Sequence, residues 1–177
     1  MITEFTMKPK AQNDRPKYLL IISAIGFVAF MIVYFAIPNY KGLVGLVAVA
    51  FLCFGLYLYT KYIASSFYYD ILVENNTPLF VVRQKAGTRE TTLARIELRH
   101  IVRIEELDKT AIKEHKTPEG YLKYFYNPTM SPDKLVLITA VSRYEKAEIY
   151  IEAERDYIVT LNEYAKLARE LYPDDED

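Results

Sequence analysis

The stretch that decides the architecture of this chain runs from Tyr18 to Tyr62. It holds two apolar segments, YLLIISAIGFVAFMIVYFAI at residues 18–37 and GLVGLVAVAFLCFGLYLYT at residues 42–60, and neither contains a charged residue. Only the residues PNYK separate them. At about 1.5 Å of rise per residue, a helix of this length spans the roughly 30 Å hydrocarbon layer of a bilayer. The sequence therefore predicts a hairpin of two transmembrane helices.

The charges beside the hairpin predict its orientation. Four basic side chains precede the first segment: Lys8, Lys10, Arg15 and Lys17. The turn between the segments offers only Lys41. The positive-inside rule places the more basic flank in the cytoplasm, and two spans return the chain to the same side. We therefore expect cytoplasmic N and C termini and a location in the cytoplasmic membrane. Residues 1–17 are polar and contain two prolines, so we expect them to be disordered or to lie at the membrane surface.

Small residues recur at spacings of three to four along both segments, which are Ser23, Gly26, Ala29, Gly42, Gly45, Ala48 and Gly55. Small faces allow helix backbones to approach each other in lipid. They fit either packing of the hairpin against itself or a homo-oligomer formed through the hairpin. Neither segment contains an ionisable Asp, Glu, Lys, Arg or His, the residues that mark ion and proton paths. The hairpin is therefore expected to be a passive anchor with the lipid bilayer as its partner.

Whole-chain averages hide a contrast between the segments. The net charge is −1 because an apolar hairpin is averaged with a polar remainder. From Ser66 onward the chain has 16 Lys and Arg against 21 Asp and Glu, so this part is mildly acidic. Nucleic-acid-binding domains carry a basic surface, and we expect no nucleic-acid partner. The single cysteine, Cys53, lies in the second apolar segment and excludes an intramolecular disulfide.

From Phe67 the apolar residues follow a period of two, which is the period of a β-strand. Alternation and turn residues predict these strands: 67–73, 79–85, 91–105 with a bend near 99–100, 121–126, 134–140 and 147–153. Residues 108–120 are charged and are expected to form a loop with at most a helical turn. Apolar residues at spacings of three and four predict a helix over residues 154–171. Pro173 ends this helix, and residues 173–177 are expected to form a solvated acidic tail.

These elements predict an α+β chain in which residues 66–172 form a small antiparallel barrel or sandwich capped by a C-terminal helix. That order resembles a pleckstrin-homology-like (PH-like) domain. Residues 94–104 are similar to the I-x-L-x-x-I-x-x-I segment of bacterial PH domains, where one strand bends into the next. Residues 149–151 and 157–162 resemble the last strand and the aromatic-led capping helix of that family. A two-helix hairpin before such a domain is also a common bacterial arrangement.

The resemblance implies binding of lipid headgroups, peptides or proteins, and the fold does not decide among them. Phosphoinositide-binding members carry basic residues around the first loop between strands, but here that loop, residues 74–78, has none. The nearest basic cluster is Arg83, Lys85 and Arg89. These side chains either contact an anionic lipid surface or are ordinary solvated charges. Arg95, Arg99 and Arg103 recur every four residues beside Glu97 and Glu105, which predicts local ion pairs.

A second candidate surface is aromatic. Tyr121, Tyr124, Phe125 and Tyr126 crowd one short strand, so both of its faces are aromatic and only one can face a core. Aromatic side chains are enriched where proteins bind partners. Tyr121, Tyr124 and Tyr126 are therefore predicted to contribute to a partner surface. The alternative is that the C-terminal helix or the membrane covers the second aromatic face.

The sequence contains no set of residues with the spacing typical of a catalytic site. Glu97 and His100 have the E-x-x-H spacing of di-iron carboxylate helices, but the spacing occurs once and in a predicted strand. Glu148 and Glu152 have no nucleophile or basic group placed beside them in sequence. Glycine-rich phosphate loops, C-x-x-C and G-x-S-x-G are absent. We therefore expect a protein that is not an enzyme and that needs no metal or cofactor.

Three functional hypotheses follow. The first is a membrane-anchored, non-catalytic interaction or assembly module at the cytoplasmic face. The second is a domain that senses anionic lipid through Arg83, Lys85 and Arg89. The third is a small accessory subunit of a larger membrane complex, such as a transporter.

Overall fold

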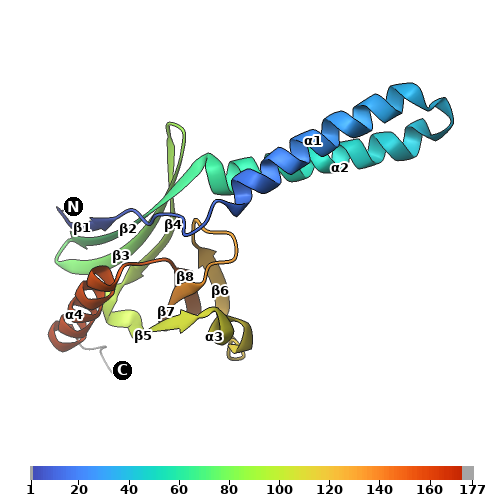
Figure 1. Ribbon diagram of the computed structural model, residues 1–177. Helices are drawn as coiled ribbons and strands as arrows, with labels where there is room; N and C mark the ends of the chain where they lie inside the picture. The colour runs from blue at the N-terminus through green and yellow to red at the C-terminus, as the bar shows by residue number, and fades with distance from the viewer. Residues whose placement is uncertain (1, 173–177) are drawn as a thin grey trace. The chain divides into compact units, whose positions relative to one another are not determined.

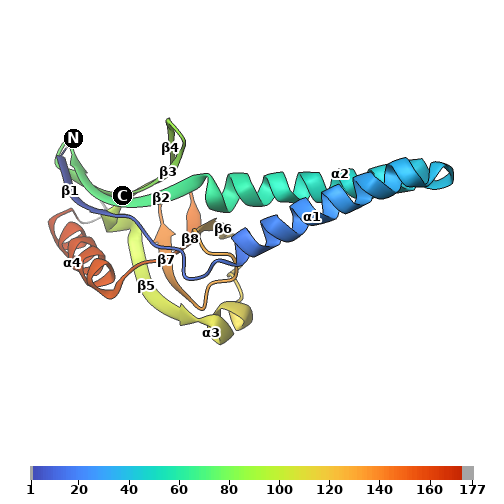
Figure 2. The ribbon, with the colours of Figure 1, turned by 45° about the horizontal axis from the view of Figure 1, so that its top comes forward.

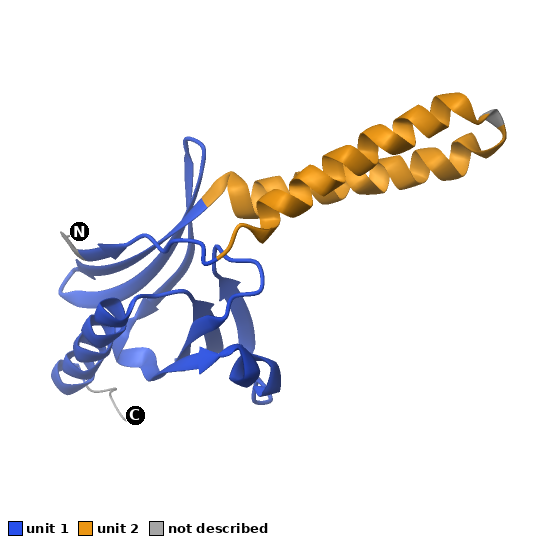
Figure 3. Ribbon diagram, viewed as in Figure 1, with its two compact units in different colours: residues 1–12, 66–177 blue, residues 13–65 orange. Residues whose placement is uncertain are grey.

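The computed structural model describes residues 2–172, and the predicted acidic tail lies outside the described residues. The chain divides into two compact units (Figure 3). Residues 13–65 form the helical unit, while the chain up to residue 12 and the chain from residue 66 onward together form the second unit. The second unit is therefore built from two segments that the helical unit separates in sequence.

The helical unit consists of α1 (Arg15–Ala36) and α2 (Lys41–Leu58), joined by the short 3-10 turn η1 (Pro38–Tyr40). Pro16 lies in the first turn of α1, where a missing N–H group costs nothing. A π-helical turn, η2 (Tyr59–Ile63), continues α2. Both helices are long enough and apolar enough to cross a membrane. The two helices predicted from the apolar segments are confirmed, with bounds that move by a few residues.

Several small residues of the hairpin lie between its two helices, whereas Ala29 and Gly42 are exposed. Ser23, Ala48 and Gly55 are buried, and the hydroxyl of Ser23 donates a hydrogen bond to the carbonyl of Phe51. A Cβ atom at Gly26 would lie 2.7 Å from the Phe51 ring. These positions therefore pack the hairpin against itself, which is the first of the two uses that their spacing allows.

Replacing Gly55 with valine is expected to weaken this packing. A Cβ atom there would lie 2.8 Å from the Ser23 hydroxyl oxygen, so the helices must separate or the Ser23 hydrogen bond must break. Overpacking of this kind costs about 1–3 kcal/mol. Gly42→Val is the matched control, because no atom lies within 4 Å of a Cβ at Gly42. Unfolding in detergent micelles, followed by circular dichroism during titration with sodium dodecyl sulfate, measures the difference. If Gly55→Val and Gly42→Val unfold at the same midpoint concentration of sodium dodecyl sulfate, the close packing of the helices at Gly55 is contradicted.

The second unit contains two four-stranded sheets (Figures 1 and 2). The first has the order β1-β2-β3-β4 and is built from β1 (Ile2–Met7), β2 (Ser65–Glu74), β3 (Thr77–Ala86) and β4 (Arg89–Glu97). The second has the order β5-β7-β8-β6 and is built from β5 (Ile101–Asp108), β6 (Leu122–Tyr126), β7 (Lys134–Val141) and β8 (Lys146–Ile151). The 3-10 turn η3 (Leu98–His100) lies at the predicted bend between β4 and β5.

Two features of the sheets correct the predicted architecture. The sheets do not close into a barrel, because β4 and β6 end their sheets and, within residues 2–172, each pairs with a strand on one side only. The second sheet is mixed, since β6 runs parallel to β8 while the other pairs are antiparallel. The segment between β5 and β6 makes this parallel pairing possible. It begins with the short helix α3 (Lys109–Glu114), whose first amides donate to the side chain of Asp108.

The expectation that residues 1–17 are disordered is wrong for residues 2–7. These residues form β1, which pairs antiparallel with β2. The hydroxyl of Thr6 donates a hydrogen bond of 2.7 Å to the buried carboxylate of Asp70. The register shifts between Thr3 and Phe5, so one extra residue interrupts the ladder. Such a bulge breaks the two-residue alternation by which a strand is recognised in a sequence.

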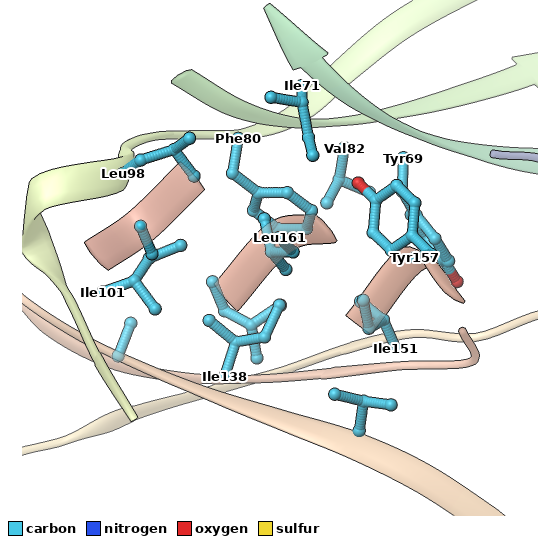
Figure 4. Packing of buried hydrophobic residues seen from close by; sticks show 14 of the residues in the cluster. Tyr69, Ile71, Phe80, Val82, Leu98, Ile101, Ile138, Ile151, Tyr157 and Leu161 are labelled. Atoms are coloured by element: carbon cyan, nitrogen blue, oxygen red, sulfur yellow. The ribbon is translucent and has the colours of Figure 1, made fainter. Parts of the chain in front are cut away.

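The main core lies between the two sheets and helix α4 (Arg155–Leu171) (Figure 4). Tyr69 and Phe80 contribute from the first sheet, Ile138 from the second, and Tyr157 and Leu161 from α4; all five are almost completely buried. The Tyr69 hydroxyl donates to the carbonyl of Tyr126 and so links the two sheets. The predicted C-terminal helix is confirmed, and its apolar stripe covers this core.

Candidate functional site

A cleft lies within the second unit, where the two sheets stay apart. It has a volume of about 1030 Å³. One wall is formed by β4 and η3, and the other by β6 and the turn between β7 and β8. The small side chains of Ala140 and Ala147 on the second sheet also line it. A volume of this size is at the upper end of the range for ligand sites, roughly 300–1,000 Å³.

Two of the predicted partner-surface residues, Tyr124 and Tyr126, line this cleft. Their rings stack with centroids 5.8 Å apart and planes 10° from parallel. The Tyr124 hydroxyl donates to Glu145 at 3.2 Å, and the Tyr126 hydroxyl donates to the carbonyl of Leu93 at 3.3 Å. Burial raises the pKa of both phenols, so both remain protonated donors at neutral pH. The pair supplies a flat apolar surface with polar groups at its rim.

The other aromatic residues of this strand lie elsewhere. Tyr121 precedes β6, and the amine of Lys146 lies 5.9 Å from the centre of its ring. Phe125 is on the opposite face of the strand, where it stacks on Tyr150 with ring centroids 4.6 Å apart. The structure therefore brings Tyr124 and Tyr126 together and leaves Tyr121 outside the cleft. The second aromatic face is occupied by Tyr150 rather than by the C-terminal helix.

Charged side chains around the cleft are largely paired. Arg95 pairs with Glu74, and Arg99 donates to Glu97 at 2.7 Å. Outside the cleft, Arg103 lies 2.5 Å from Glu105. The predicted local ion pairing is confirmed for Arg99 and Arg103, whereas Arg95 pairs with a residue 21 positions away on another strand. As a result, the cleft presents few unpaired charges to a ligand.

The predicted lipid-contact cluster divides in the structure. The guanidinium of Arg83 pairs with Asp70 and Glu90, and the hydrogen bond with Asp70 holds the pKa of Arg83 above its ordinary value. Asp70 is completely buried, so this pair belongs to the fold. Lys85 and Arg89 flank the turn between β3 and β4, are exposed, and form no ion pair within residues 2–172. Of the three predicted lipid-contact residues, Lys85 and Arg89 therefore remain available to an anionic surface.

A buried carboxylate that sequence reasoning left without partners is Glu148 on the outer face of β8. It accepts hydrogen bonds from Thr117 at 2.7 Å and from Tyr150 at 3.0 Å, and it lies 2.8 Å from Nε2 of His115. Burial opposes its ionised form, but the three hydrogen bonds outweigh burial and hold the pKa of Glu148 below its ordinary value. The cluster fastens residues 115–117 to the second sheet. No sequence spacing reveals it, because its members lie about 30 residues apart.

This cluster predicts a specific pH dependence of stability. Since the pKa of Glu148 is lower in the folded chain, its stabilisation is fully present above the unfolded-state pKa of about 4.3 and is lost as the pH falls through the folded-state value. Glu148→Gln is expected to remove this part of the acid sensitivity. Urea unfolding between pH 3 and 7 measures it. If the difference in the free energy of unfolding between the wild type and Glu148→Gln stays constant below pH 5, the assignment of this pH dependence to Glu148 is contradicted.

A second buried carboxylate, Glu152, joins the N-terminal segment to the rest of the second unit. It accepts hydrogen bonds from the backbone N–H and the hydroxyl of Thr129, and that hydroxyl accepts from the backbone N–H of Gln12. The Gln12 side chain donates to the carbonyl of Lys134 and accepts from the N–H of Asp133. Burial raises the pKa of Glu152. This network holds the chain in place immediately before the helical unit begins.

The described residues contain no group of three or more His, Cys, Asp or Glu side chains arranged to hold a metal ion. Cys53 is a free thiol on α2. Comparison of the chain with protein-family models, with curated proteins and with solved structures finds no match. The geometry of the cleft and of the hairpin is therefore the basis for a functional assignment.

Proposed function

We propose that this protein is an integral membrane protein whose soluble unit is a PH-like interaction module that binds a partner protein in the cleft between β4 and β6. The observation that carries the proposal is the cleft itself, in which two stacked tyrosines face an unpaired strand edge. Aromatic side chains with a polar rim are the usual composition of a protein-binding surface.

The hairpin supports the location of this module in the membrane. Its outward side chains are large and aliphatic, and Ile25, Ile32, Leu46 and Leu56 are each more than half exposed. Such a surface suits lipid and is costly in water. The basic flank before α1 favours a cytoplasmic soluble unit. Because the helical unit joins the soluble unit directly at residues 12–13 and 65–66, the module stays at the membrane surface.

A PH-like description rests on the order of the elements. Two sheets are followed by one amphipathic helix that covers the core, as the resemblance implies. The parallel strand β6 and the N-terminal strand β1 are additions to that order.

The proposal is tested by filling the cleft. Val141 lines the cleft and is half-buried, so Val141→Trp is expected to occupy it without disturbing the core. The control is Val102→Trp, the same substitution at an exposed position of β5 that does not line the cleft. Full-length protein is extracted from membranes in mild detergent, and co-purifying proteins are quantified by mass spectrometry. We expect a partner that is retained by the wild type and by Val102→Trp and lost with Val141→Trp. Equal retention by all three proteins would reject the cleft as the binding site.

Anionic lipid is a second candidate ligand, favoured by the exposure of Lys85 and Arg89. Each such charge contributes about 1 kcal/mol near an anionic surface. We expect Lys85→Ala and Arg89→Ala together to reduce co-sedimentation of the soluble unit with phosphatidylserine vesicles, and Arg83→Ala to lower its stability instead. No change in binding for the double variant would remove lipid from consideration.

A further inference from the structure

Strand β4 is an edge strand, and its free side borders the cleft. It pairs with β3 on one side only, and its residues from Leu93 to Glu97 form a wall of the cleft. An edge strand carries a row of backbone N–H and C=O groups without partners, to which another extended chain can pair. The direction of these backbone groups decides which of them a ligand in the cleft can reach.

The hydrogen bond between Tyr126 and Leu93 shows which backbone groups of β4 face the cleft. Because the carbonyl of Leu93 accepts from the Tyr126 hydroxyl, this carbonyl points away from β3. The N–H of Ala94 belongs to the same planar trans peptide and therefore points toward β3, where Ala94 is paired with Val82. Backbone groups alternate in direction along an antiparallel strand. The N–H groups of Arg95 and Glu97 consequently point to the free edge.

The side chains around this edge suit a polypeptide. Leu93, Ala94 and Ile96 are partly buried against the core and leave an apolar wall opposite the tyrosine pair. Arg95 and Arg99 are already neutralised by Glu74 and Glu97. A phosphate or carboxylate ligand that bound Arg95 or Arg99 would have to break these ion pairs. The balanced charge complements a neutral peptide backbone, whose N–H and C=O groups match the groups that β4 leaves unpaired.

We propose that the partner enters the cleft as an extended segment that adds to β4 as a further strand of the first sheet, pairing with the N–H groups of Arg95 and Glu97. Side chains alternate across a strand, so every second residue of the segment contacts Tyr124 and Tyr126. This inference rests on the proposed function and specifies the form of the partner.

The experiment uses a phage-displayed library of random 12-residue peptides, selected on the full-length protein in detergent micelles. Selected peptides are synthesised with a fluorophore, and their dissociation constants are measured by fluorescence polarisation. Arg95→Ala removes the side chain and keeps the N–H group, whereas Arg95→Pro removes both. Proline is tolerated in an edge strand when its missing N–H faces outward. We expect Arg95→Ala to bind nearly as the wild type does and Arg95→Pro to bind about tenfold more weakly, a change of about 1.4 kcal/mol that lies within the range for one lost hydrogen bond.

A second measurement keeps the protein unchanged. Each amide of a selected peptide is N-methylated in turn, which removes one backbone donor at a time. Strand pairing predicts that methylation weakens binding at alternate positions. The inference is overturned if no peptide is selected, if Arg95→Pro binds as tightly as Arg95→Ala, or if the methylation scan shows no alternation. If Val141→Trp abolishes partner binding while these tests show no backbone dependence, the proposed function stands and strand addition is rejected.

Discussion

Removing residues 1–12 is expected to destabilise the second unit by at least about 3 kcal/mol. The deletion removes β1, the Thr6 hydrogen bond to Asp70 and the three hydrogen bonds of Gln12. A typical intramolecular hydrogen bond contributes about 1 kcal/mol, and a buried acceptor left unpaired costs more. Domains of this size are stable by only about 5–15 kcal/mol. A fragment that begins at residue 66 is therefore expected to be partly unfolded.

The measurement compares three proteins in urea. The first contains residues 66–172, and the second carries residues 1–12 joined to residues 66–172 by a flexible Gly/Ser linker in place of the hairpin. The linker is feasible because α1 and α2 form an antiparallel hairpin whose two ends lie together (Figure 1). A third protein, in which residues 2–7 are scrambled, controls for the linker. The structural role of β1 is contradicted if all three proteins unfold at the same urea concentration.

Leu161→Ala is expected to cost about 2–5 kcal/mol, the range for truncating a fully buried leucine. Leu161 has no exposed surface and packs from α4 into the core between the two sheets. Removing its side chain leaves a cavity beneath the helix that closes the core. Because η3, which forms part of the cleft wall, packs against α4, the same change is expected to loosen that wall.

Leu167 provides a matched control on the same helix, because its side chain is about half exposed. Leu167→Ala is expected to change the free energy of unfolding by about 0.5 kcal/mol or less, as is usual for surface substitutions. Urea unfolding of the linked soluble protein measures both variants. Similar losses for the two leucines would show that α4 does not cap the core.

The elements that could be predicted from the sequence have strong local patterns. The two apolar segments have the length of a membrane span, and the helix over residues 154–171 has a regular stripe that matches α4 closely. The bend at residues 99–100 was also predictable, because η3 interrupts an otherwise continuous strand pattern. In each case the apolar residues whose spacing predicts the helix, strand or bend are close together in sequence.

The candidate site was only partly predictable. The concentration of tyrosines indicated a surface near Tyr124 and Tyr126, but nothing in the sequence placed β4 opposite them. The pairing of Arg83 with the buried Asp70 was equally hidden, since the two residues lie on neighbouring strands and no local spacing joins them. Strand pairing is a long-range choice, and several registers are compatible with the same alternating pattern.

By itself, the sequence determined the helical hairpin, the strand-rich unit after it and the C-terminal helix, because these depend on local periodicity and on the length of apolar runs. The tertiary structure alone decided that residues 2–7 complete the first sheet, that β6 runs parallel to β8, and that the two sheets remain open. These features depend on contacts between residues far apart in the chain. The cleft with its unpaired β4 edge, on which the proposed function rests, is a consequence of that openness.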